Sequence, residues 1–309
     1  MLSPEGKNVQ TDIWKGMMYV AGAAILWSTG GVLIKSISLN ACQISFWRAM
    51  FATFTIFAIV KPKQISSDIT TLFAAVAYAA TLILFVVATK LTTAANAILL
   101  QYTAPIYVGL FGWLFLKERV SFSHIVTMGI GFIGMAIFFV DGLSTENHLG
   151  NLAAIFSGLG FGVFLVLLRK KSDDNPIDSV LIGNGLIMIF CASAMMFSAA
   201  QDPRGIDHTD VLYGFAISTA DSVMVAFLGI LQIGIPYVIF SRGIAAIPAL
   251  DASLLSMLEP VLNPIWVLLF VGEIPSFNAI IGGAILLAAV AFQSYRTGQF
   301  FKSQEIKGN

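Results

Sequence analysis

Long apolar runs follow one another along the whole chain, separated by short polar segments. Each run has about the 17–25 residues that a helix needs to cross the hydrocarbon core of a bilayer. The runs are apolar on every side, whereas barrel strands would alternate apolar and polar positions over about 10 residues. We therefore predict an all-α integral membrane protein with ten transmembrane helices. The predicted spans are 16–34, 43–60, 71–88, 93–116, 122–140, 150–168, 179–199, 222–240, 249–270 and 277–295.

The segments between the runs are predicted loops. Residues 61–68 and 169–176 are polar and contain proline, which is typical of a connection between spans. Residues 211–220 fit either an interfacial stretch or an early start of the eighth span. The first run, 16–34, is longer than the apolar core of a signal peptide, and similar runs follow it. We therefore expect the first run to be a retained helix.

The composition explains where these runs are buried. Hydrophobic residues make up 57% of the chain and charged residues 11%, and the mean hydropathy is +0.86. Soluble domains carry about 25% charged residues. A water-soluble core cannot bury so much apolar side chain, so the expected partner is the lipid bilayer. The formal net charge is zero, which gives no reason to expect a nucleic-acid partner.

Residues that usually bind metals are scattered. Cys42 and Cys191 show no metal-binding or redox spacing, and the three histidines, His124, His148 and His208, form no motif. We interpret both cysteines as small apolar residues of their helices. We expect no metal site and no cofactor.

The distribution of positive charge predicts the orientation. Thirteen of the 17 Lys and Arg residues lie in segments on the same side as the N-terminus, and three lie on the other side. Positive charge accumulates on the cytoplasmic side of a membrane protein. We therefore expect an inner-membrane protein with two cytoplasmic tails, 1–15 and 296–309. The remaining cation, Arg48, lies near the end of the second span, where a long side chain is expected to reach the interface.

An internal repeat links the two halves of the chain. Residues 94–125 and 249–280 align without a gap, with eleven identical positions among thirty-two. Leu and Ala matches carry little weight, but proline precedes glutamate by thirteen residues in both copies. These pairs are Pro105 with Glu118 and Pro260 with Glu273. The alternative explanation is that membrane helices in general share such sequence patterns.

The repeat unit contains five predicted helices. Five is an odd number, so the second unit would enter the membrane upside down, as in the inverted repeats of secondary transporters. We predict two such units, 16–140 and 150–295. The two repeat-related carboxylates, Glu118 and Glu273, then lie at opposite membrane faces. We expect them to do structural work at a helix end or a gate.

Several motifs resemble one transporter family. They are Ala-Ile-Leu-Trp-Ser-Thr-Gly at 24–30, Phe-Trp-Arg at 46–48, the two proline-to-glutamate segments, the stretch 232–243, and Leu-Leu-Ser-Met-Leu-Glu-Pro at 254–260. Over roughly 16–295 the chain is similar to the EamA-type branch of the drug/metabolite transporter superfamily, and within it to the YddG-like exporters of amino acids and metabolites. The resemblance implies ten helices, cytoplasmic termini and a central cavity that opens alternately to each side.

Polar side chains inside the spans are the candidate site residues. Such groups are costly at membrane depth unless they face a cavity or a partner. The alternative for each is ordinary packing, and Glu259 in particular fits an ammonium contact, a proton carrier or a partner for a buried cation. The candidates are Trp27, Ser28, Tyr78, Asn96, Gln101, Tyr102, Gln232, Tyr237, Ser253, Ser256 and Glu259.

Small and helix-breaking residues add to this picture. Proline removes an intrahelical donor and frees a carbonyl, and such interruptions often lie near transporter sites. We therefore expect Pro105, Pro236 and Pro260 to interrupt their helices. Gly158 and Gly162 form a small-xxx-small pair, which indicates close helix packing.

Together these features favour a secondary transporter that exports small organic solutes, such as amino acids, aromatic ones included. The chain has no Walker-type phosphate loop, so ATP is not the expected energy source. It also lacks the Gly-x-Ser-x-Gly and His-Glu-x-x-His motifs, so we do not expect an enzyme. An intramembrane enzyme and a channel or receptor remain the alternatives. A coupled proton and the oligomeric state are left open.

Overall fold

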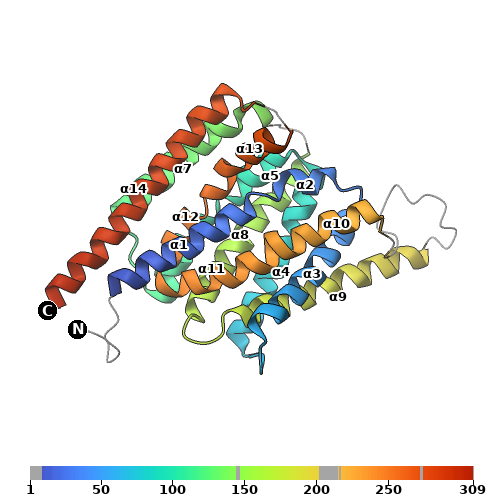
Figure 1. Cartoon of the computed structure of the whole chain (residues 1–309), viewed down its shortest axis with the longest axis horizontal. Helices are drawn as coiled ribbons and strands as arrows, with labels where there is room; N and C mark the ends of the chain where they lie inside the picture. The colour runs from blue at the N-terminus through green and yellow to red at the C-terminus, as the bar shows by residue number, and fades with distance from the viewer. Residues whose placement is uncertain (1–8, 144–146, 202–214, 216, 272–273, 309) are drawn as a thin grey trace.

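The computed structural model describes residues 9–143, 147–201, 215, 217–271 and 274–308 (Figure 1). This part of the chain is built from helices and contains no strand. Helices satisfy all backbone hydrogen bonds within one segment, which apolar surroundings require. The elements are α1 (Val9–Trp27), α2 (Gly31–Ser36), α3 (Ala41–Val60), α4 (Ile69–Leu91), α5 (Ala94–Gln101), α6 (Ala104–Phe111), η1 (Gly112–Leu116), α7 (Phe122–Phe139), η2 (Val140–Gly142), α8 (His148–Lys170), α9 (Ile177–Gln201), α10 (Thr219–Phe227), η3 (Leu228–Gly234), α11 (Ile235–Ala246), α12 (Ala249–Leu255), α13 (Leu258–Val271) and α14 (Phe277–Gly308).

In the described part of the chain, eight helical segments are long and apolar enough to cross a membrane, so the chain is a multi-pass membrane protein. The predicted spans 16–34 and 249–270 are not among the eight. The count of ten therefore remains a prediction. The eight segments are Ala41–Val60, Ile69–Leu91, Ala94–Leu116, Phe122–Gly142, His148–Lys170, Ile177–Phe197, Thr219–Ala246 and Phe277–Ser303.

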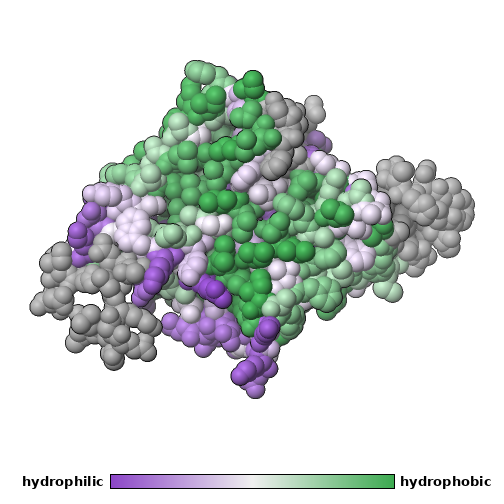
Figure 2. All heavy atoms as spheres, viewed as in Figure 1, coloured by the Kyte–Doolittle hydropathy of each residue, from purple (hydrophilic) through white to green (hydrophobic). Residues whose placement is uncertain are grey.

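The surface between the helix ends is apolar. Large hydrophobic side chains such as Met18, Phe73, Phe122 and Ile189 are exposed on several different helices. Figure 2 shows hydrophobic residues spread over the middle of the visible face, with hydrophilic residues gathered toward its lower edge. A continuous apolar surface of this kind fits a lipid environment.

Helices from the first half of the chain pack against helices from the second half. The main contacts pair α4 with α8, α11 with α1, α7 with α14, and α3 with α9 (Figure 1). The thiols of Cys42 and Cys191 hydrogen-bond at the contact between α3 and α9. The core of the molecule therefore lies between the two halves.

Close helix packing around α8 depends on two glycines. A Cβ atom on Gly158 would lie 2.6 Å from the carbonyl oxygen of Gln101, and one on Gly162 would lie 2.7 Å from the Cβ atom of Tyr107. Both approaches are too close for any side chain. The expected small-xxx-small packing is confirmed, and it holds α5 and α6 against α8.

Two predicted continuous helices are broken at repeat-related places. The run 93–116 breaks between α5 and α6, and the run 249–270 breaks between α12 and α13. Pro105 lies in the first turn of α6 and Pro260 in the first turn of α13. Each proline lacks the N–H group that would bond the carbonyl four residues earlier. The first run, 16–34, is likewise broken between α1 and α2.

A third interruption occurs in the eighth predicted span. Residues Leu228–Gly234 form a π-helical segment between α10 and α11. Pro236 follows at the start of α11 and has no N–H group for the carbonyl of Gln232. The N–H of Ile235 instead bonds the carbonyl of Ile230, five residues earlier. The proline thus explains the wider turn.

The terminal helices extend beyond the apolar runs that predicted them. α1 begins at Val9 rather than at 16, and α14 continues to Gly308 rather than ending at 295. The added residues include strong helix formers such as Gln, Lys and Glu, which continue a helix at little cost. Within the predicted tails, Trp14 packs beside Gly298.

Candidate functional site

A small cavity lies in the interior where the interrupted helices meet, and we call it the central cavity. Its volume is about 40 Å³. Six of the eleven candidate residues line it, namely those on α1, the α5–α6 break, η3, α11 and α13. The lining residues are Trp27, Arg48, Thr81, Leu82, Phe85, Gln101, Tyr102, Phe161, Gln232, Ile233, Tyr237 and Glu259.

Arg48 is a cavity residue that the sequence did not indicate. Its side chain is 3% exposed, so the expectation that it reaches the interface is wrong. Arg48 lies seven residues after the first residue of α3, or about 10 Å along the helix axis. The helical segments α9, α10 and η3 pack around α3 and bury this side chain. Burial by neighbouring helices leaves no signal in the local sequence.

Tyr102 connects the two broken helices across the cavity. It is the C-cap of α5, and its hydroxyl oxygen lies 2.8 Å from the carbonyl oxygen of Ser256 and 2.7 Å from Oε2 of Glu259. Ser256 follows α12, and its carbonyl is the one that Pro260 leaves without its usual intrahelical donor. A helix interruption therefore supplies one of the polar groups that Tyr102 contacts.

Two glutamine side chains line the cavity, and they differ in whether their amide groups are hydrogen-bonded. Nε2 of Gln101 donates to Oγ of Ser157 at 2.9 Å, so this amide is held in place. Oε1 of Gln232 is buried and has no hydrogen-bond partner among the described residues. A Cβ atom on Gly30 would lie 2.1 Å from Nε2 of Gln232, so only glycine leaves room for this side chain.

Aromatic rings form the apolar wall of the cavity. The ring of Trp27 lies 5.2 Å from that of Tyr237, 5.0 Å from that of Phe240 and 6.2 Å from that of Phe161. Tyr237 and Trp27 also line the cavity directly. The site thus combines an aromatic wall with a few polar groups, as small-molecule pockets usually do.

Five candidate residues lie outside the lining of the central cavity. The hydroxyl of Tyr78 donates to Oδ1 of Asn184 at 2.9 Å, and its ring packs behind Tyr237. Oγ of Ser28 accepts from Nε1 of Trp266 at 2.8 Å. These contacts hold helices together around the cavity.

The other three candidates, Asn96, Ser253 and Ser256, have side chains that bond to neighbouring helical residues or are buried among them. Nδ2 of Asn96 donates to Oδ1 of Asn151 at 2.8 Å. The hydroxyl of Ser256 donates to the carbonyl of Ala252, so its carbonyl rather than its side chain faces Tyr102. Ser253 is buried, and its hydroxyl has no partner among the described residues.

One end of the molecule is closed by a cluster around Glu118, and we call this the Glu118 end. Oε1 of Glu118 lies 3.2 Å from Nε of Arg169, and Oε2 accepts from the backbone N–H of Ala249 at 2.9 Å. Nη1 of Arg169 donates to the carbonyls of Ile244, at 3.1 Å, and Ala245. The cluster therefore joins η1, α8, α11 and α12.

Burial raises the pKa of the Glu118 carboxyl, and the Ala249 N–H and the Arg169 guanidinium oppose that shift. Glu273, the repeat-related partner of Glu118, lies outside the described residues. Its predicted role therefore stays a prediction.

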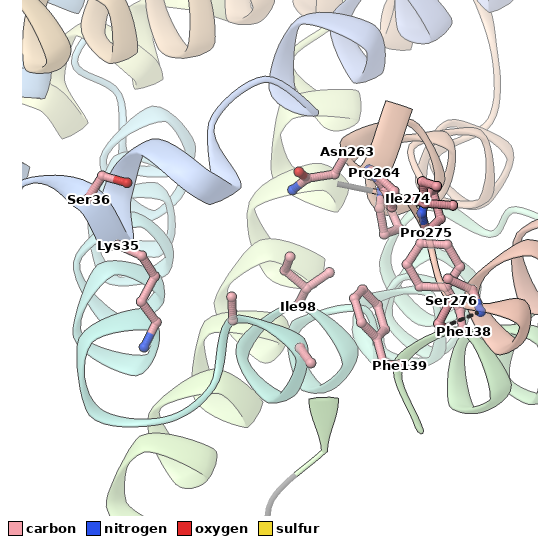
Figure 3. Close-up of a pocket in the computed structure, with 14 residues that line it drawn as sticks. Lys35, Ser36, Ile98, Phe138, Phe139, Asn263, Pro264, Ile274, Pro275 and Ser276 are labelled. Carbon is pink, nitrogen blue, oxygen red and sulfur yellow. Dashed lines mark hydrogen bonds between the residues drawn. The ribbon is translucent and has the colours of Figure 1, made fainter. Parts of the chain in front are cut away.

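A larger pocket of about 500 Å³ lies at the opposite end, which we call the Lys35 end (Figure 3). Lys35 and Asn263 lie on different sides of this pocket, and Nζ of Lys35 donates to the carbonyl of Thr92 at 2.7 Å. On α13, Pro260 lines this pocket while its neighbour Glu259 lines the central cavity. Only a short stretch of α13 therefore separates the two spaces.

Residues suited to a metal are not assembled in the part of the chain that the structure describes. No group of three or more His, Cys, Asp or Glu side chains there is arranged to hold an ion. The chemistry that the central cavity offers is therefore hydrogen bonding, one cation, one carboxyl group and aromatic contact.

Comparisons with known proteins agree with this architecture. The sequence profile of the EamA-like transporter family matches residues 14–140 and again 148–295. A protein of Archaeoglobus fulgidus described as an uncharacterized transporter is 26% identical over 87% of this chain and 92% of its own length. Solute carrier family 35 member G1 of Homo sapiens is 21% identical over 93% of this chain and 80% of its own.

The fold also has a close solved counterpart. A crystal structure of another protein superposes with a TM-score of 0.75 at 18% identity, covering 92% of this chain and 98% of that one. At this identity the likeness concerns the fold alone. The family profile, in contrast, covers most of the chain in two copies, and the chain therefore belongs to the EamA-like transporter family.

Proposed function

We propose that this membrane transporter is a secondary transporter that exports small organic solutes, such as amino acids and related metabolites, across the cell membrane. The solute would bind in the central cavity, which would open alternately to each face. The observation that carries this proposal is the place of the cavity. It lies between two broken helices, with the ion-paired closure around Glu118 at one end and the larger pocket at the other.

The size of the central cavity indicates what must move. A site needs about 10–15 Å³ to hold one water, so about 40 Å³ holds a few waters and no amino acid. Solute binding therefore requires the cavity to widen. Widening toward the Lys35 end is the shorter route, because the larger pocket there already reaches Pro260.

The proposed topology is ten spans in two inverted units, 16–140 and 150–295, with both tails in the cytoplasm. Support comes from the two copies of the family profile and from the repeat-related breaks beside Pro105 and Pro260. The main contacts support it too, since α4 on α8 and α11 on α1 pair spans three and six, and eight and one. Such contacts exchange under a five-helix shift.

The topology is tested with a phosphatase that is active only outside the cytoplasm, fused after Asn309. We expect no activity from this fusion, because the Glu118 end would face the cytoplasm. The same phosphatase fused into the segment that joins α2 to α3 should be active. Activity of the Asn309 fusion would contradict the topology and leave the assignment of the cavity intact.

Transport itself is tested in proteoliposomes with a panel of radiolabelled amino acids and related metabolites. The informative variant is Gln232→Ala, which removes the cavity amide. A lost polar contact in a buried site costs about 1–3 kcal/mol, so transport should fall by roughly tenfold at equal protein content. Ser253→Ala is the control, because it removes a buried hydroxyl outside the cavity that has no partner among the described residues. Wild-type rates for Gln232→Ala with every accepted solute would rule out this site.

A further inference from the structure

The central cavity contains one cation and one carboxyl group, Arg48 on α3 and Glu259 on α13. Nη1 of Arg48 is buried without a hydrogen-bond partner, and no ion pair in the described part of the chain includes Arg48. A buried guanidinium is stable only when it is paired and hydrogen-bonded. Arg48 therefore brings one unpaired donor, Nη1, to the lining of the cavity.

The hydrogen bonds around Tyr102 accommodate both the protonated and the ionised form of Glu259. A phenol carries one proton, so Tyr102 can donate either to the carbonyl of Ser256 or to Oε2 of Glu259, both of which lie within 2.8 Å. When Glu259 carries a proton, it donates to Tyr102, which then donates to Ser256. All three groups are then satisfied. When Glu259 is ionised, Tyr102 donates to it, and the carbonyl of Ser256 still accepts from the backbone N–H of Glu259 at 3.0 Å.

The charge of Arg48 influences which of the two forms of Glu259 is present. Arg48 and Glu259 line the same cavity, and a nearby cation favours the ionised form of a carboxyl group. An anion bound at Arg48 would neutralise the guanidinium and place a second negative charge near Glu259. Both effects favour the protonated carboxyl group, because charges interact strongly in a buried site.

We propose that the central cavity binds the carboxylate of its solute at Arg48 and that Glu259 takes up one proton from water as this carboxylate binds. The proposal rests on the proposed transport function and names the chemical group that the site recognises. Arginine binds carboxylates through two parallel hydrogen bonds. Trp27, Phe161 and Tyr237 would contact the apolar part of the solute. The carboxylate and the proton then cross together, so their binding is reciprocally coupled.

The other titratable groups near this pair are tyrosines. Tyr102 contacts Glu259, Tyr237 on α11 lines the cavity, and the ring of Tyr78 on α4 packs against that of Tyr237. The residues of α1, α8 and η3 that line the cavity are uncharged, and no described residue of α14 lines it. The proton uptake is therefore assigned to Glu259.

The test measures binding and proton uptake with the purified full chain. Three probes share one ring and differ in charge: 3-phenylpropanoate, phenylalanine and 2-phenylethylamine. Isothermal titration in buffers of different ionisation enthalpy gives both affinity and protons taken up. We expect both carboxylates to bind with about one proton taken up, and the amine to show no binding.

Variants separate the two roles. Arg48→Gln should weaken binding of 3-phenylpropanoate by roughly 100-fold, because the bound carboxylate loses its buried cationic partner. Arg48→Lys should restore part of it. Glu259→Gln should still bind the carboxylate but without proton uptake. Arg242→Gln, which removes an exposed arginine, is the control and should leave both quantities unchanged.

Three results would overturn the proposal. The first is wild-type affinity in Arg48→Gln, provided that this variant unfolds at the wild-type temperature. The second is carboxylate binding by the wild type without proton uptake. The third is binding of 2-phenylethylamine alone. None of these contradicts transport, which is judged separately by flux in proteoliposomes, so the two proposals can fail independently.

Discussion

Two carboxylates eight residues apart on the last broken helix have opposite surroundings. Asp251 on α12 is enclosed by hydrogen-bond donors from neighbouring helices, whereas Glu259 on α13 shares one tyrosine hydroxyl and faces a cavity. Neither is exposed, since Asp251 is buried and Glu259 is half-buried. Burial alone therefore does not separate a structural carboxylate from a functional one.

Oδ1 of Asp251 receives three hydrogen bonds. Its donors are Nε2 of Gln293 at 2.9 Å, Oγ1 of Thr297 at 2.5 Å and Nε2 of His124 at 3.3 Å. The backbone N–H of Ser121 donates to Nδ1 of His124, which leaves the ring proton on Nε2, where it points at Asp251. The cluster ties α12 to α7 and α14, with its hydrogen bonds satisfied.

The Arg48–Glu259 pair shows the contrasting pattern. Arg48 has an unpaired buried donor, Gln232 has an unpaired buried acceptor, and both line the same space. Buried polar groups are nearly always hydrogen-bonded, so several unpaired groups around one cavity call for an explanation. The proposed site therefore differs from the Asp251 cluster in that unpaired buried groups lie together around one cavity, rather than in charge or depth.

The comparison predicts the largest loss of stability at Asp251. Asp251→Ala should lower the free energy of unfolding by on the order of 3 kcal/mol, because Gln293, Thr297 and His124 lose their acceptor. Thermal unfolding in detergent measures the change. Asp251→Asn keeps an acceptor oxygen and should lose much less. Equal melting temperatures for Asp251→Ala and the wild type would contradict a structural role.

A smaller loss of about 1–3 kcal/mol is expected from overpacking at Gly158. Gly158→Ala would place a Cβ atom 2.6 Å from the carbonyl oxygen of Gln101 and push the α5–α6 break away from α8. Gly185→Ala on α9 is the matched control, because nothing lies within 4 Å of its Cβ position. If the two variants melt at the same temperature, the packing of the broken helix is looser than described.

The smallest effect is expected at the Glu118 end, and it depends on pH. Burial raises the pKa of Glu118 above its ordinary value of 4.5 in the folded chain. The folded state then binds the proton more tightly than the unfolded state, so the stability contributed by this proton is lost as the pH rises. The wild type should therefore lose stability relative to Glu118→Gln as the pH rises from 4.5 through the raised pKa. A wild type that gains stability relative to Glu118→Gln over that interval would contradict the burial of this carboxyl.

The sequence predicted the helical membrane fold because apolar run length is a direct requirement of the bilayer. It also indicated Gln101, Tyr102, Gln232 and Glu259, since polar residues beside prolines inside a span carry a chemical signal. Pro105 and Pro260 indicated the breaks in the runs 93–116 and 249–270, whereas the break in the run 16–34 was not predicted, because a single turn of lost helix leaves the apolar pattern unchanged.

Other parts of the site depended on tertiary contacts. Arg48 lies near the end of an apolar run, and only the neighbours of α3 make it an interior residue. Phe161 and Phe85 resemble many other phenylalanines of the chain, so no local feature singles them out. Tyr78 is a candidate on sequence grounds, but its hydroxyl bonds Asn184 and does not line the cavity.

If the cavity residues carry transport and the residues behind them carry stability, two tyrosines should respond differently to the loss of their hydroxyl groups. Tyr102→Phe removes the hydroxyl that contacts Ser256 and Glu259, and Tyr78→Phe removes the one that contacts Asn184. Each substitution deletes one buried hydroxyl, so the pair is matched in chemistry. Transport per folded molecule and melting temperature are measured for both variants. We expect Tyr102→Phe to lose transport by about tenfold or more, and Tyr78→Phe to have a lower melting temperature and normal transport. Normal transport in Tyr102→Phe together with lost transport in Tyr78→Phe would contradict this expectation.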